Sequence, residues 1–72
     1  MKRYYIDFEQ QYTEAKFYFT DNHNLINVVG RLYGPFLSVA KAKAYLTEVI
    51  DGEIISRRAL KNKIRYTKPE EL

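Results

Sequence analysis

The chain of 72 residues lacks cysteine and tryptophan and has only three glycines, two prolines and one histidine. Without cysteine it can form no disulfide, no thiol nucleophile and no Cys-based zinc or iron–sulfur site. Its glycines do not form a phosphate-binding or dinucleotide-binding pattern. No run approaches about 18 apolar residues and no secretory signal is apparent, so we expect no membrane association. These absences predict a cytoplasmic protein without a cofactor.

What remains is ordinary for a small folded domain. Hydrophobic residues make up 46% of the chain and charged residues 29%, within 8.6 kDa. One domain takes roughly 100–200 residues, so we expect a single domain over residues 1–68 and a frayed acidic tail over 69–72. Seven tyrosines and four phenylalanines supply the dense aromatic packing that so short a chain needs. Both a monomer and a homodimer are compatible with this composition.

Two early segments alternate apolar and polar residues, which is the pattern of half-buried strands. The apolar positions are Tyr4, Ile6 and Phe8 in the first and Ala15, Phe17 and Phe19 in the second. The short connection Gln10–Thr13 predicts an antiparallel hairpin. After the turn-forming residues Asp21–Asn24, the pattern predicts a third strand over Leu25–Tyr33 that ends at Gly34-Pro35, with a bulge at Gly30.

The clearest element is an amphipathic helix over Ser38–Ile50. Its apolar stripe consists of Val39, Ala42, Tyr45, Leu46, Val49 and Ile50. Ser38 is suited to cap the first turn, and Gly52 stands where a helix commonly ends. The predicted fold class is therefore α+β, with a three-stranded antiparallel sheet packed on one amphipathic helix.

The segment after Glu53 is ambiguous. A second, basic helix from Ser56 to about Pro69 gathers the apolar residues on one half of its surface and five of the six cations on the other, with Lys63 nearer the apolar side. A hairpin that turns at Lys61-Asn62 is the alternative, because apolar and basic residues also alternate from Leu60 to Tyr66. We favour the helix because it separates the charges more cleanly.

Few residues are candidates for catalysis. His23 lies in a predicted turn, and Ser38 stands at a helix start where capping explains it. Asp7 and Glu9 share a strand face, although exposed acids on a hairpin usually serve solubility. Nucleophilic catalysis needs a nucleophile, a base and an orienting group held together. No such set is apparent, so we expect neither an enzyme nor a metal site.

The distribution of charge is more informative. The net charge is +3, yet residues 1–36 contain four bases and four acids. Residues 54–68 contain six bases and no acid: Arg57, Arg58, Lys61, Lys63, Arg65 and Lys68. Clustered cations release counterions from a phosphate backbone, so these six residues are the candidate contacts to DNA or RNA. A basic helix face is also often only a solvated surface.

A second candidate surface is the sheet face that points away from the helix. We expect it to carry Tyr5, Lys16, Tyr18, Arg31 and Tyr33. Aromatic and cationic residues on an open sheet can stack unpaired bases, but tyrosine and arginine are equally typical of protein interfaces. The sequence thus predicts a small non-enzymatic regulatory or accessory protein, of the kind found in phages and mobile elements, that contacts nucleic acid. The alternative is an inhibitor or adaptor that binds a protein through its tyrosine-rich face.

Overall fold

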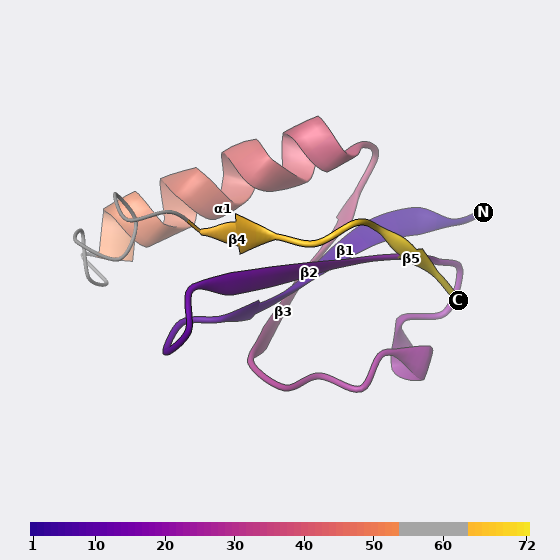
Figure 1. Ribbon diagram of the computed structural model, residues 1–72. Coiled ribbons are helices and arrows are strands. Elements are labelled where there is room, and N and C mark those ends of the chain that lie inside the picture. The colour runs from indigo at the N-terminus through magenta and orange to yellow at the C-terminus, as the bar shows by residue number, and fades with distance from the viewer. Residues whose placement is uncertain (54–63) are drawn as a thin grey trace.

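The computed structural model describes residues 1–53 and 64–72, which form a mixed β-sheet covered on one face by a helix (Figure 1). The elements in chain order are β1 (Arg3–Glu9), β2 (Glu14–Thr20), the 3-10 turn η1 (His23–Leu25), β3 (Arg31–Phe36), α1 (Val39–Glu53), β4 (Arg65–Tyr66) and β5 (Glu70–Glu71). The sheet order is β3-β1-β2-β4, and β5 also pairs with β2. The predicted α+β class is correct at this level, but the sheet is neither three-stranded nor wholly antiparallel.

The hairpin of β1 and β2 forms as predicted. Its register pairs Ile6 with Phe17 and Phe8 with Ala15, and all four side chains are buried on the face toward α1. The Thr13 amide donates to the Gln10 carbonyl at 3.1 Å and closes the connection. Alternation of apolar and polar residues therefore determined both the strands and the face that each side chain occupies.

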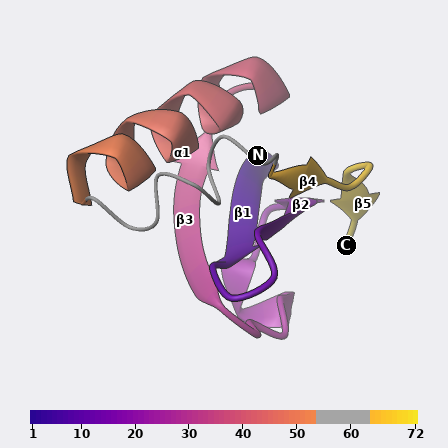
Figure 2. The ribbon, with the colours of Figure 1, turned by 60° about the vertical axis from the view of Figure 1, so that its left-hand side comes forward.

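The third strand lies later in the chain than predicted. Residues 21–30 form an irregular loop with η1 on the side of the sheet away from α1, and β3 begins at Arg31 (Figures 1 and 2). The carboxylate of Asp7 holds this loop, because it accepts the amides of Val29 at 2.7 Å and Gly30 at 2.8 Å. Asp7 is only 2% exposed, so the expectation that it is a solvated surface acid is wrong.

Gly30 belongs to this loop rather than to a bulge within a strand. A Cβ atom at this position would lie 2.2 Å from the carbonyl oxygen of Phe8. The backbone of the loop therefore approaches β1 so closely that only glycine fits.

The strand β3 continues through Gly34-Pro35 to Phe36, whereas the sequence predicted that it would end there. Its register with β1 pairs Ile6 with Tyr33 and Tyr4 with Phe36. β3 therefore has one more residue than β1 between these two pairs, which is a β-bulge. Proline is tolerated because β3 is an edge strand with an extra residue at this point.

The helix α1 begins as predicted, with the Ser38 hydroxyl accepting the Lys41 amide at 3.1 Å. It continues through Gly52 to Glu53, so the prediction that Gly52 terminates it is wrong. The core between α1 and the sheet consists of Ile6, Phe8, Ala15, Phe17, Ala42, Leu46 and Ile64. The described residues include no helix that is long and apolar enough to span a membrane.

The C-terminal segment adds to the sheet as an edge parallel to β2. Glu14 pairs with Arg65 in β4, and Tyr18 pairs with Glu70 in β5. The predicted second helix is wrong over residues 64–68, and the remainder of it, residues 56–63, lies outside the described residues. The tail expected to fray contains β5 instead, and Glu71 forms an ion pair with Lys2.

Candidate functional site

The candidate site lies on the sheet face opposite α1, which we call the outer face. The register places Tyr5 opposite Tyr18 and Asp7 opposite Lys16 and Leu32. Directly opposite residues point to the same side of a sheet, so these five side chains share the outer face. The loop of residues 21–30 covers one part of this face, and two hollows elsewhere on it are lined by described residues.

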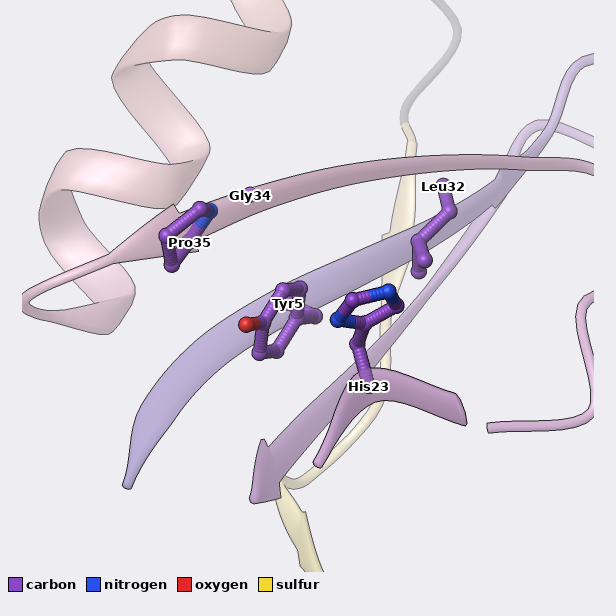
Figure 3. Close-up of a pocket in the computed structure, with 5 residues that line it drawn as sticks. All are labelled: Tyr5, His23, Leu32, Gly34 and Pro35. Carbon is purple, nitrogen blue, oxygen red and sulfur yellow. The ribbon is translucent and has the colours of Figure 1, made fainter. Parts of the chain in front are cut away.

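The first hollow, of about 290 Å³, lies beside Tyr5 and is lined by Tyr5, His23, Leu32, Gly34 and Pro35. We call it the Pro35 groove. Figure 3 shows the Tyr5 and His23 rings side by side, below the backbone of Gly34 and Pro35. The two ring centroids are 5.8 Å apart and the ring planes are inclined by 41°. The groove thus offers two aromatic rings and two apolar side chains.

Gly34 is essential to the shape of this groove. Its φ of +141° lies in a region that L-residues with a side chain rarely adopt. A Cβ atom here would lie 2.6 Å from Cδ2 of Tyr5. Glycine therefore lets the Tyr5 ring pack directly beneath the backbone of β3.

The second hollow, of about 240 Å³, lies beside Tyr18 on the other side of the hairpin. It is lined by Lys16, Phe17, Tyr18, Thr67, Lys68 and Glu70. We call it the Lys68 groove. It forms where pairing between β2 and the C-terminal segment is interrupted. Ala15 pairs with Tyr66 and Tyr18 with Glu70, so the C-terminal segment has one more residue than β2 between these two pairs.

Thr67 and Pro69 explain this interruption. The Thr67 hydroxyl accepts a hydrogen bond from the Phe17 amide and donates one to the Ala15 carbonyl, each at 3.4 Å. Pro69 has no amide hydrogen to offer to β2. Regular pairing resumes at β5, and the Leu72 amide donates to the Phe19 carbonyl at 3.0 Å.

The outer face carries charges of both signs. Burial raises the pKa of Tyr18 above its ordinary value of 10.0, and Asp7, Glu70 and Glu14 add to the rise while Lys16 opposes it. Tyr18 is therefore a neutral phenol at physiological pH, available for stacking and for donating a hydrogen bond.

Only part of the predicted basic surface falls on described residues. Arg65 and Lys68 are exposed at the β2 edge, on an extended segment rather than on a helix. The other four candidates, Arg57, Arg58, Lys61 and Lys63, lie outside the described residues. The prediction that five of the six cations, all but Lys63, share one helical face is wrong for Arg65 and Lys68, because residues 64–68 are extended.

The predicted tyrosine face is partly assembled. Tyr5, Lys16 and Tyr18 lie together on the outer face, but Tyr33 lies opposite Ile6 and Arg31 opposite Phe8, on the side of α1. The Tyr33 ring packs 5.9 Å from the ring of Tyr45 in α1. The prediction for Tyr33 and Arg31 is therefore wrong, because β3 has a different start and register from the predicted strand.

Sequence reasoning missed two contributors to the site. It predicts His23 as a solvated turn residue, and His23 is exposed in η1, but the pattern did not indicate that it lines a groove with Pro35, which was predicted to end a strand. No local pattern at His23 or Pro35 indicated the groove, because the loop that contains His23 is held against the sheet by the Asp7 carboxylate, which accepts the amides of Val29 and Gly30. Comparisons of the chain with models of known protein families, with curated proteins and with solved structures find no match.

Proposed function

We propose that the protein is a small non-enzymatic accessory protein that contacts nucleic acid through its basic C-terminal segment. Residues 54–68 provide six positive charges without an acid. Cations gathered in a short segment bind phosphate backbones with a strong dependence on salt. The function follows from charge and its placement rather than from a catalytic arrangement.

The observation that carries the proposal is the position of Lys68 beside Lys16. Both side chains line the Lys68 groove, although they are distant in sequence. Backbone hydrogen bonds hold the segment there, from Arg65 to the Thr13 carbonyl at 2.8 Å and from Thr67 to the Ala15 carbonyl at 3.1 Å. Lys68 therefore joins Lys16, a cation of the central hairpin, on one surface.

Acidic residues offset this surface only in part. Glu71 pairs with Lys2, on the other side of the sheet edge from Glu70. Within residues 1–53 and 64–72, Lys16, Arg65 and Lys68 form no ion pair, while Glu14 and Glu70 lie next to them along β2. Asp7, opposite Lys16, is a third carboxylate on this face, so the described charges balance and the excess of positive charge comes from Arg57, Arg58, Lys61 and Lys63 in the sequence.

The proposal is tested by the salt dependence of nucleic-acid binding. Fluorescence anisotropy of a labelled oligonucleotide between about 50 and 200 mM salt should give a steep fall of log affinity with log salt. The double variant Arg65→Ala/Lys68→Ala should bind more weakly. The slope of log affinity against log salt should become shallower by about one for each phosphate contact that is lost. The triple variant Arg57→Ala/Arg58→Ala/Lys61→Ala should do the same.

Lys41→Ala is the matched control, because Lys41 is exposed on α1 and its loss removes one charge from the opposite side of the sheet. Its slope should stay at the native value. Absence of binding to DNA and RNA at about 50 mM salt would refute the proposal, since phosphate contacts are strongest there.

A further inference from the structure

We propose that the outer face binds a single strand, with one base in the Pro35 groove and an adjacent phosphate in the Lys68 groove. This inference rests on the proposed function and specifies the form of nucleic acid and the place where it binds. Its starting point is the cross-strand pair of Tyr5 and Tyr18. Each of these tyrosines lines one of the two grooves, so the pair forms a ridge between them.

The Pro35 groove has the chemistry of a base-binding site. Its Tyr5 and His23 rings provide flat π-surfaces, and Leu32 and Pro35 provide apolar walls. Its volume of about 290 Å³ is near the lower bound of about 300 Å³ for pockets that take drug-sized ligands. One planar heteroaromatic ring suits both the size and the lining.

The Lys68 groove has the chemistry of a phosphate-binding site. Two cationic residues, Lys16 and Lys68, line it, and the neutral Tyr18 can donate a hydrogen bond to an anionic oxygen. Glu70 also lines the groove and weakens its attraction for an anion. The site therefore suits a phosphate that is held by a neighbouring base contact as well as by charge.

The spacing of the two grooves favours a single strand. The grooves lie at the border of β3 with β1 and at the border of β2 with the C-terminal segment, about two strand spacings or roughly 10 Å apart, so neighbouring parts of one nucleotide chain can reach both sides of the ridge. A duplex hides the faces of its bases in the stack, whereas unpaired bases can lie on aromatic side chains. Contacts at Tyr5 thus require a strand with free bases.

The loop of residues 21–30 narrows the part of the outer face that a ligand can reach, which favours a narrow ligand. The loop of residues 21–30 occupies part of the outer face, as the burial of Asp7 and Thr20 shows. A standard protein interface takes about 800 Å² from each partner. The described part of this face contains the Pro35 groove and the Lys68 groove, with two lysines along the second, which matches a polyanion with planar groups.

The test compares three labelled probes of equal length with the native protein. These are an oligothymidylate of about twelve nucleotides, the same backbone without bases, and a duplex. Base stacking contributes roughly tenfold or more for each base, so the single strand should bind about tenfold more tightly than the abasic strand. Tyr5→Leu, which keeps an apolar side chain but removes the π-face, should abolish this preference.

Tyr12→Leu is the control, because Tyr12 is 57% exposed in the turn between β1 and β2, away from both grooves. Equal affinity for the strands with and without bases, or tighter binding of the duplex, would overturn the inference while leaving the proposed function intact. Failure to bind any of the three probes at low salt would overturn both and leave a protein partner as the ligand of this face. The probe comparison uses the native chain, so it holds even if Tyr5→Leu does not fold.

Discussion

Tyr5 and Tyr18 lie directly opposite each other on β1 and β2, and each borders a different groove of the outer face. Both grooves arise where an extra residue interrupts regular pairing, in β3 on one side and in the C-terminal segment on the other. β-Bulges commonly reshape a sheet next to functional sites. The central hairpin thus supplies the aromatic ridge, and its two irregular neighbours supply the hollows.

The fit between Tyr5 and Gly34 gives the first prediction. Gly34→Ala should lower the free energy of unfolding by at least about 1 kcal/mol, because the new methyl group meets the Tyr5 ring at an unfavourable φ. Urea titration measures this loss, and near-UV circular dichroism should report the displaced tyrosine. An unchanged denaturation midpoint would show that Tyr5 does not pack under β3.

Tyr18 gives a prediction about alkaline pH. Its pKa is higher in the folded chain than its ordinary value of 10.0, so above that pH the unfolded chain loses the proton first. The folded state then binds more protons than the unfolded state, and stability falls as pH rises through the folded pKa. The contribution is fully present below pH 10.0.

Removing the Tyr18 hydroxyl should therefore flatten the alkaline end of the stability profile. Above about pH 10, the free energy of unfolding should fall more steeply with pH for the native chain than for Tyr18→Phe. Tyr12→Phe is the matched control and should follow the native profile, since Tyr12 is 57% exposed. Parallel profiles for Tyr18→Phe and the native protein would contradict the raised pKa.

The elements that were predicted correctly have strong local patterns. The hairpin follows from alternation at Ile6, Phe8 and Phe17, and the start of α1 follows from the Ser38 cap. The third strand was misplaced because Ile26 and Val28 also fit an alternating pattern, while the Asp7 carboxylate, distant in sequence, holds that stretch as a loop. A tertiary hydrogen bond overrode the local pattern.

The C-terminal segment shows a second limit of sequence reasoning. Residues 64–66 fit both helical and strand periodicity, and short apolar runs do not distinguish the two. Pairing with β2 decides the outcome, since the Arg65 and Thr67 amides donate to carbonyls of that region. The candidate site depends on this pairing, so the Lys68 groove was beyond reach of the sequence, while Tyr5, Lys16 and Tyr18 were not.

Asp7 gives a third prediction, about the loop of residues 21–30. Asp7→Asn should destabilise the fold by about 2 kcal/mol, because one of its two accepting oxygens becomes an NH2 group that faces a backbone amide. Glu9→Gln removes the same charge from the same strand and should change stability by less than about 0.5 kcal/mol. Equal midpoints for the two variants in urea would argue against the buried carboxylate.

Thr67 gives a fourth prediction, about how the C-terminal edge is held. Thr67→Val keeps the shape of the side chain but removes the hydroxyl that bridges Phe17 and Ala15, so stability should fall by about 1 kcal/mol. Thr67→Ser retains the hydroxyl and should lose less. Amide hydrogen exchange of Leu72, which donates to the Phe19 carbonyl, should become faster in Thr67→Val, and native protection in that variant would show that the hydroxyl is dispensable.

Glu70 gives the last prediction, because it is the acidic residue in the Lys68 groove. Glu70→Gln removes a charge that repels phosphate, so affinity for the single strand should rise by about two- to fivefold at low salt, the range expected for an exposed charge. Glu48→Gln makes the same change in net charge on α1 and should leave affinity near the native value. Equal gains in both variants would mean that only net charge matters. A gain confined to Glu70→Gln would place the phosphate beside Lys16 and Lys68.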